Sequence, residues 1–425
     1  MSALLEDDDM SDFDEASFSI LKEIIASDEC VREAVELETL LTSVPAIAPE
    51  SGGGGESEKC GVLESYLADH GFKHFSHYDA PDARVKGGFR PNLTVTLEGD
   101  RSDFSVWVIS HLDVVPPGNI EAWQSDPWVL KESKDGRLTG RGVEDNQQGI
   151  VSSVIASLAF LKSGIVPRRD VKLLFIADEE CGSAFGIQYL LKEHSDLFKK
   201  DDLILIPDGG DSEGKNIEIA EKNILWLRAH TIGAQSHGSS PQRGKNAAIA
   251  GYDLALRLNA LENVFSKRDE LFSPSWSTFQ PTKKESNVQS VNIIPGDDVF
   301  YMDCRVLPCY TLAEVKEQIA AQVKATEDRY GVKISVEALQ AEESPATSEN
   351  APIVKALSFA LEKSHGIKAV PVGIGGGTVA AYLRAAGFPA AVWSTIENTC
   401  HQPNEYCLIK NIIKDAQTLA ALFLL

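Results

Sequence analysis

Three short apolar runs, each bounded by turn residues, set the strongest limit on how this chain can fold. They are residues 104–109, 171–176 and 203–206, and the first two lead into stretches with helical periodicity. Strands that alternate with helices form a largely parallel sheet, because each helix returns the chain to the edge where the next strand begins. The sequence therefore predicts an α/β domain built on a mostly parallel sheet.

Acidic and imidazole side chains follow each of these three runs. They are His111 and Asp113 after the first run, Asp178, Glu179 and Glu180 after the second, and Asp208 after the third. Parallel strands collect ligands outside their carboxyl ends, so we expect these side chains to meet at one edge of the sheet. Taken alone, each of these residues would be interpreted as an exposed turn carboxylate or an ordinary histidine. The three consecutive acids would be interpreted as a run of solvent-exposed charges. Their convergence favours a buried functional site.

Two imidazoles and three carboxylates form a candidate ligand set beside Glu179. The five ligands are His111, Asp145, Glu180, Asp208 and His401. Zinc accepts nitrogen and carboxylate oxygen, and the lack of cysteine ligands points to a catalytic site. Three carboxylates and one bridging hydroxide would balance two zinc ions, with cobalt or manganese as alternatives. In such a site Asp145 bridges the metals and Glu179 acts as general base.

His111 and Asp113 are two residues apart, so their side chains point the same way if the strand continues. Metal-bound histidines usually donate their second ring nitrogen to a carboxylate or a carbonyl. We therefore expect Asp113 to orient His111 rather than to bind the metal itself.

Residues 224–339 have a different pattern from the rest of the chain. Their expected elements are strands at 224–227, 299–302 and 332–337 and a helix at 247–261. The last of these strands alternates apolar and polar residues, which is typical of a half-buried antiparallel strand. We predict an inserted α+β domain at 224–339, within a catalytic domain formed by residues 1–223 and 340–425.

Composition excludes several classes of function. The net charge of −23 repels nucleic acid and anionic membrane surfaces, and no apolar run approaches the roughly 20 residues that span a bilayer. Residues 6–9 are acidic where a secretory signal would be basic, and seven cysteines without a CxxC pair fit a reducing compartment. We predict a cytoplasmic protein.

The glycine-rich run at residues 373–377 is not a dinucleotide-binding site, because it lacks the strand, the helix and the acidic residue that such a site requires.

Five motifs in a fixed order carry a resemblance to a known family. They are Ser110–Pro116, Gly140–Asp145, Asp178–Glu180, Pro207–Asp208 and His401–Glu405. Together they resemble the two-zinc family of aminoacylase, carnosinase, succinyl-diaminopimelate desuccinylase and glutamate carboxypeptidase, over the chain from about Glu36 to its end. The resemblance implies that His111 and Asp208 hold one zinc and Glu180 and His401 the other. It also implies that Asp145 bridges the two ions and that Glu179 is the base.

The inserted segment resembles the lid of that family, which also mediates dimerisation. The resemblance implies that His237 supports the oxyanion, often across the dimer. The implied substrate-binding residues are Asn292, Arg305, Gly376, Gly377 and Thr378. An arginine suits a substrate carboxylate because its planar fork can donate two hydrogen bonds to it. We therefore expect a homodimer that acts on a small molecule or a short peptide.

Two departures from the family pattern bear on the substrate. Asn146–Gln148 stand where the family often has a lysine-glycine pair, and the glycine turn at Gly375–Gly377 lacks the aspartate that commonly follows it. By the same resemblance, aspartate at position 208 is typical of dipeptidases and aminopeptidases, and glutamate of deacylases. We predict cleavage of a peptide bond in dipeptides or short peptides with a free carboxylate. The alternatives are an N-acyl amino acid deacylase and a non-catalytic binding protein.

Overall fold

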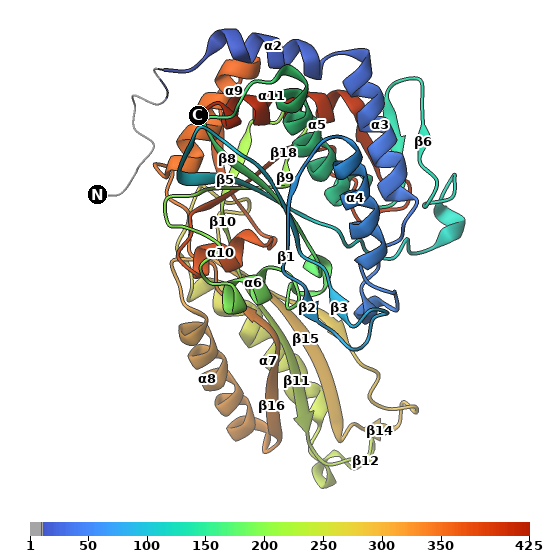
Figure 1. Ribbon diagram of the computed structural model, residues 1–425. Helices are drawn as coiled ribbons and strands as arrows, with labels where there is room; N and C mark the ends of the chain where they lie inside the picture. The colour runs from blue at the N-terminus through green and yellow to red at the C-terminus, as the bar shows by residue number, and fades with distance from the viewer. Residues whose placement is uncertain (1–9, 11) are drawn as a thin grey trace. The chain divides into compact units, whose positions relative to one another are not determined.

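The computed structural model describes residue 10 and residues 12–425 (Figure 1). The acidic residues 6–9, which entered the prediction of a cytoplasmic location, lie outside the described residues. The chain divides into two units. The first contains the chain through Ile219, Thr347–Pro371 and Thr378–Leu425, and the second contains Ala220–Ala346 and Val372–Gly377. These boundaries lie four and seven residues from the predicted ones, and they assign Gly376 and Gly377 to the second unit rather than to the catalytic domain.

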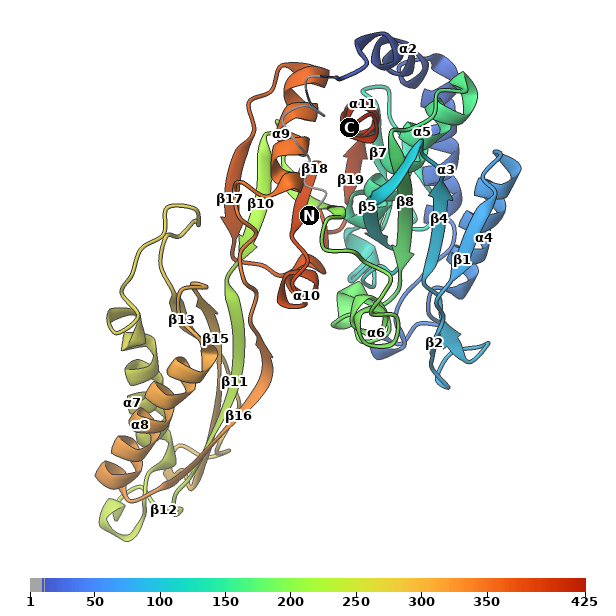
Figure 2. The same cartoon turned by 60° about the vertical axis from the view of Figure 1, so that its left-hand side comes forward.

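The main sheet has eight strands in the order β1-β4-β8-β5-β9-β18-β10-β17 (Figure 2). Its four central strands are mutually parallel and are β8 (Arg169–Ile176), β5 (Arg101–His111), β9 (Leu203–Asp211) and β18 (Ala390–Thr395). The other members are β1 (His74–His77), β4 (Leu93–Leu97), β10 (Asn216–Glu221) and β17 (Val370–Ile374). The three predicted apolar runs lie in β5, β8 and β9, so the prediction of a mostly parallel α/β sheet is confirmed.

Helices pack on the central strands and cover their apolar side chains. The helices of the first unit are α2 (Glu15–Ile25), α3 (Asp28–Thr42), α4 (Ser57–Asp69), α5 (Gln148–Ser163), α6 (Ile187–Glu193), α9 (Pro352–His365), α10 (Ala380–Ala385) and α11 (Ile409–Phe423). α5 is buried on all sides over its first 13 residues because α2, α3 and α11 pack around it. Alternate residues of β5, Trp107 and Ile109, join a core cluster with residues of α6 and α10.

The second unit contains a four-stranded antiparallel sheet and two long helices. The sheet order is β13 (Thr278–Lys284), β15 (Asp297–Val306), β11 (Asn223–Ile232) and β16 (Lys333–Glu342), and the helices are α7 (Ala247–Asn259) and α8 (Leu312–Tyr330). Leu225, Leu227 and Ala229 of β11 alternate into a core shared with both helices. α8 begins at a capping box, in which Thr311 and Glu314 each accept a backbone N–H of the other.

Short strands complete the architecture. They are β2 (Ala80–Pro81), β3 (Phe89–Arg90), β6 (Lys131–Glu132), β7 (Arg137–Thr139), β12 (Ser236–His237), β14 (Ile293–Ile294) and β19 (Tyr406–Leu408). β19 pairs with β7, which holds the segment after His401 beside the segment before Asp145. The two strands are far apart in the sequence. One candidate ligand, Asp145, follows β7, and another, His401, precedes β19.

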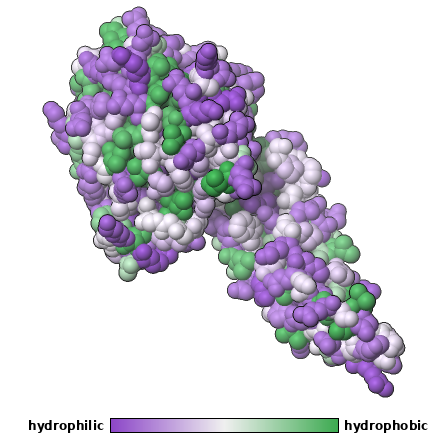
Figure 3. Space-filling model, turned by 90° about the vertical axis from the view of Figure 1, so that its right-hand side faces the viewer, coloured by the Kyte–Doolittle hydropathy of each residue, from purple (hydrophilic) through white to green (hydrophobic). Residues whose placement is uncertain are grey.

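Across the described part of the chain, no helix combines the length and apolar character needed to cross a membrane. On the face shown in Figure 3, hydrophilic residues predominate and hydrophobic ones form small groups. All seven cysteines are free thiols.

A buried carboxylate ties the start of β5 to the segment before β9. Asp202 accepts hydrogen bonds from Ser105 N at 2.8 Å, Trp107 Nε1 at 2.9 Å and Lys199 N at 2.8 Å. We expect Asp202→Asn to lower the free energy of unfolding by about 1–3 kcal/mol, because the new amide NH₂ would face an N–H donor. Denaturant unfolding with an unchanged m value checks this, and a variant as stable as the native protein would contradict it.

Candidate metal centre

The five predicted ligands and the predicted base come from separate loops at one edge of the main sheet, all within the first unit. His111 ends β5, and Asp208 lies in the last part of β9. Asp145 belongs to the short helical segment η3 (Val143–Gln147) before α5. Glu179 and Glu180 begin the turn η4 (Glu179–Cys181) after β8, and His401 lies between β18 and β19. The carboxyl ends of parallel strands therefore bring these side chains together, as the sequence predicts.

The carboxylate of Asp145 lies between two histidines. Its Oδ1 is 2.8 Å from His111 Nε2, and its Oδ2 is 3.0 Å from His401 Nε2. The same ring atom of His111 is 3.6 Å from Asp208 Oδ1, and that of His401 is 3.1 Å from Glu180 Oε1. One oxygen of Asp145 thus faces each of two histidine-carboxylate pairs, and these are the two pairs that the family resemblance implies.

Glu179 lies beside the pair formed by His111 and Asp208. One ligand atom of each of these three residues falls within 4.8 Å of the others. Burial raises the pKa of the Glu179 carboxyl well above its usual value, against the opposing effect of His111, and Asp208 raises it further. A carboxylate with a raised pKa is suited to accept a proton near neutral pH.

Charge at this site indicates what it can bind. Four carboxylates converge here, from Asp145, Glu179, Glu180 and Asp208. In the described part of the chain, the ion-pair partners of Asp145, Glu180 and Asp208 are His111 and His401. Buried carboxylates require compensating positive charge. Imidazole nitrogen and carboxylate oxygen are zinc ligands, and the site contains enough of them for two ions that share one carboxylate. The residues present therefore fit a pair of divalent cations.

Asp113 contacts His111 as predicted, and its carboxylate has a further task that the sequence did not predict. Its carboxylate accepts the backbone N–H groups of Glu179 and Glu180, each at 3.0 Å, and so holds the turn that carries both. His111 Nδ1 lies 2.9 Å from the Asp113 backbone oxygen and 3.5 Å from the carboxylate. The carbonyl rather than the carboxylate therefore makes the closer contact with the ring. This was not foreseen because the partners of the carboxylate lie on another strand end.

Asn146, one of the departures from the family pattern, links two strand ends. Its Oδ1 accepts from His111 N at 3.2 Å, and its Nδ2 donates to Pro207 O at 2.6 Å and to Asp208 Oδ1 at 3.0 Å. An amide suits this position because it must both donate and accept. The next residue, Gln147, is buried with its side-chain amide among Glu38, Thr42 and Lys59.

Lys59 contributes a positive charge near the position where the family often has a lysine. Its Nζ lies 3.1 Å from the side-chain oxygen of Gln147 when that amide donates to Glu38. Burial lowers the pKa of Lys59 to about 8, although Asp113, Glu38 and Glu405 each raise it. The ammonium group of Lys59 thus lies in the field of the carboxylates that support the ligands.

The sequence analysis assigns no role to Glu144 or Glu405. Both nevertheless accept hydrogen bonds from the loops that contain the candidate metal ligands Asp145 and His401. Glu144 is 5% exposed and Glu405 is 1% exposed, and each carboxylate accepts several backbone N–H groups from the loop that contains the other. Burial raises the pKa of Glu405 to about 7, and Arg141 opposes this rise. Both residues stand within the family motifs, which was the one signal available.

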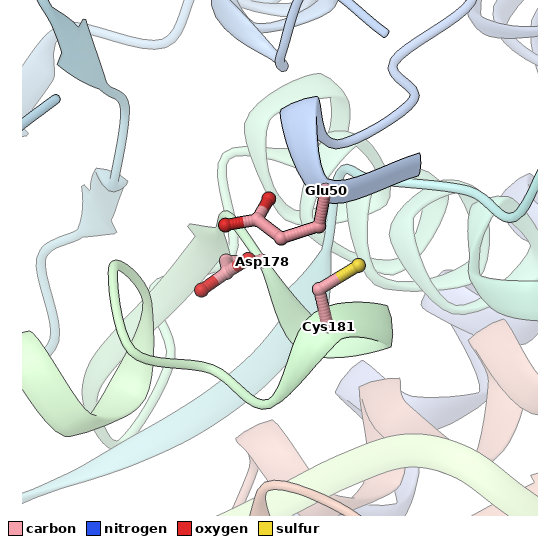
Figure 4. A group of neighbouring side chains, drawn as sticks. All are labelled: Glu50, Asp178 and Cys181. Carbon is pink, nitrogen blue, oxygen red and sulfur yellow. The ribbon is translucent and has the colours of Figure 1, made fainter. Parts of the chain in front are cut away.

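A second cluster, formed by Glu50, Asp178 and Cys181, could also hold a cation by distance alone. Figure 4 shows Glu50, from the turn η1 (Pro49–Ser51), lying over the segment that carries the other two residues. Arg84 Nη1 is 2.6 Å from Glu50, and Arg90 Nη2 is 3.5 Å from Asp178. The two carboxylates are therefore compensated by guanidinium groups, and this cluster is an ion-pair network.

The predicted substrate-binding residues of the second unit fall into two separate groups. His237 lies in β12 opposite Ile293 of β14, and Gly238 N donates to Asn292 O at 2.7 Å. Asn292 precedes the start of β15, and Arg305 lies one residue from the other end of that strand. Roughly 25 Å of strand therefore separates the two residues. Within one chain, Asn292 and Arg305 are therefore far apart, and the prediction that both bind one substrate carboxylate stays a prediction.

Arg305 lies with the glycine turn. Its Nε and Nη2 donate to the Asp303 carboxylate at 2.7 and 3.2 Å, and its Nη1 donates to Gly375 O at 2.8 Å. Three of its five N–H donors are used in these bonds. Thr378 belongs to the first unit, where its Oγ1 accepts from Ala380 N at 3.1 Å at the start of α10.

Comparison with known proteins decides the family. The sequence profile of peptidase family M20/M25/M40 matches residues 107–425. The chain belongs to this family. The predicted resemblance is thereby confirmed, and the protein is an M20 metallohydrolase.

Relatives of this M20 protein cover nearly its whole length. An uncharacterized metallohydrolase of Methanocaldococcus jannaschii is 38% identical over 404 residues, or 92% of this chain and 98% of that protein. Succinyl-diaminopimelate desuccinylase 2 of Ruegeria sp. is 25% identical over 382 residues, or 89% and 91% of the two chains. The structure of aminopeptidase PepT from Bacillus cereus matches with a TM-score of 0.74 at 20% identity, over 92% and 98% of the two chains. The last comparison shows a shared fold.

Metal affinity is expected to rise with pH. Burial raises the pKa of Glu180 to about 7, and the hydrogen bond with Asp145 raises that of His401 to about 10, so the metal-free site holds protons that a cation must displace. For each proton that the cation displaces, the affinity rises by up to about tenfold for every unit of increase in pH, as long as the pH is below the pKa of that group. Chelator competition with Zn²⁺ at pH 6 and pH 8 measures this, and equal affinities would contradict the assignment of these groups.

Proposed function

We propose that this M20 metallohydrolase uses two zinc ions to cleave a peptide bond in dipeptides or short peptides with a free carboxylate. One observation carries the proposal: the two oxygens of Asp145 face His111 and His401, and each histidine lies beside one further carboxylate. This arrangement supports two cation positions that share one ligand. Cobalt or manganese, which accept the same donors, are the alternatives to zinc.

The residues of the site divide the chemical work. Zinc, when bound, supplies Lewis-acid polarisation of the scissile carbonyl and acidifies water. Glu179 accepts the proton of the attacking water and passes it to the leaving amine, since its buried carboxyl has a raised pKa. Asp113 holds Glu179 in place through the backbone N–H. His401 has a half-exposed side chain, so its side of the site is open to an entering substrate.

The substrate class rests on two kinds of support. Asp208, rather than glutamate, is typical of the dipeptidase and aminopeptidase branches that the motifs resemble, and an aminopeptidase shares the fold. The sequence similarity to a succinyl-diaminopimelate desuccinylase favours the second candidate, an N-acyl amino acid deacylase. The same residues would serve both reactions, because each breaks an amide bond.

A homodimer accounts for the separation of the substrate-binding residues. His237 and Asn292 lie together, but far along the sheet from Arg305 and the glycine turn. We propose that His237 and Asn292 act on the site of a second copy of the chain, where His237 supports the developing oxyanion. We propose that Arg305, Gly376, Gly377 and Thr378 also bind the substrate.

Substitution of the base tests the reaction. We expect Glu179→Ala to lower kcat by roughly 100- to 10,000-fold on the best substrate of a mixed panel of dipeptides and N-acyl amino acids, the range for a lost general base. Zinc content should not change, because Glu179 is not a proposed ligand. Glu193→Ala, which removes an exposed carboxylate at the end of α6, is the matched control. Turnover of N-acyl substrates alone selects the deacylase, and an active Glu179→Ala variant contradicts the assigned base.

Mixing two inactive variants tests the role of the dimer. His237→Ala and Glu179→Ala would each be inactive as a homodimer. In a mixed dimer, the chain with intact Glu179 receives His237 from its partner. We expect equal mixing to restore about one quarter of the native activity, the statistical share of complete sites. If His237 serves its own chain, mixing restores nothing.

A further inference from the structure

Two buried glutamates, Glu144 and Glu405, each hold the loop in which the other resides. We propose that they act as positioning residues that set the separation between Asp145 and His401, and so determine the affinity of the site for its second cation. The proposal rests on the proposed two-metal function. It concerns the loops behind the ligands rather than the ligands themselves.

The carboxylate of Glu144 organises the loop that contains His401. It accepts the backbone N–H of Glu397 at 2.5 Å and that of Cys400 at 3.0 Å, and it also accepts the backbone N–H of Thr399. The hydroxyl of Thr399 donates to it at 3.0 Å. His401 follows directly and has a φ of 61°, in the left-handed region that non-glycine residues rarely adopt. Glu144 therefore holds the backbone in the shape that presents the His401 ring.

Glu405 organises the loop that contains Asp145 in the same way. It accepts the backbone N–H groups of Gly142 at 3.0 Å, Glu144 at 3.0 Å and Asp145 at 3.1 Å, and Arg141 donates to it at 2.5 Å. Gly142 has a φ of 86°, and a Cβ there would lie 2.5 Å from a methyl group of Val114. The tight turn that brings four donors to one carboxylate therefore requires glycine.

Glu144 and Glu405 act as a pair because each accepts hydrogen bonds from the loop that contains the other. Glu144 is one residue from Asp145, and Glu405 is four residues from His401. Each carboxylate therefore fixes the loop of one ligand relative to the loop of the other, across more than 250 positions of sequence. In Glu144 and in Glu405, each carboxylate oxygen accepts a hydrogen bond from at least one backbone N–H group. These oxygens therefore face the loop backbone and not a bound cation. Their influence on the metal passes through Asp145 and His401.

Zinc titration of variants tests this proposal. In Glu144→Gln and Glu405→Gln, one oxygen becomes an NH₂ group that faces backbone N–H donors, so each loop loses part of its anchor. We expect the affinity for the weaker of two Zn²⁺ ions to fall about 10- to 100-fold in each variant, the usual effect of losing a residue that orients a ligand. The d–d absorption of the Co²⁺-loaded protein should change as well. The native protein must first bind two Zn²⁺, since a failure there rejects the proposed function instead.

Two further measurements separate positioning from simple loss of stability. Asp202→Asn is the matched control, because it removes a buried carboxylate that accepts three hydrogen bonds away from the site. It should lower stability without changing zinc affinity or the Co²⁺ spectrum. The double variant should bind zinc about as weakly as either single variant, because either change releases the same pair of loops. The proposal is overturned if Glu144→Gln and Glu405→Gln keep native zinc affinity and spectrum, or if their effects on affinity are additive.

Discussion

The accumulation of negative charge at one sheet edge is the constraint on which the rest of the structure depends. Asp145, Glu179, Glu180 and Asp208 lie together, and two histidines are the ion-pair partners of Asp145, Glu180 and Asp208. Such a group is stable in a folded protein when cations compensate it. Two other buried carboxylates of the first unit, Glu56 and Glu405, have guanidinium partners in Arg90 and Arg141. The contrast distinguishes a metal site from a structural ion pair.

The scaffold holds these charges with backbone N–H groups and strand geometry. Parallel strands β5, β8 and β9 deliver His111, the Glu179–Glu180 turn and Asp208, and Asp113 fixes that turn by two backbone hydrogen bonds. The remaining ligands come from irregular loops, which need anchors of their own. Carboxylates provide those anchors because one carboxylate can accept from several N–H donors at once.

The sequence predicted the parts of this structure that depend on local pattern and motif order. The apolar runs correspond to β5, β8 and β9, and the residues after them include three of the five candidate ligands, His111, Glu180 and Asp208. It did not predict the roles of Glu144 and Glu405, because their N–H partners belong to a loop distant in sequence and have no side-chain signature. It also did not predict that Arg305 donates to Asp303, two residues away on the same strand. The cytoplasmic location stays a prediction.

The most direct test of this account is a crystal structure of the zinc-loaded protein with anomalous diffraction recorded at the zinc absorption edge. The account predicts two anomalous peaks on either side of Asp145, one beside His111 and Asp208 and the other beside Glu180 and His401. A single peak that Asp145 does not contact would contradict the account, as would zinc bound instead at Glu50, Asp178 and Cys181.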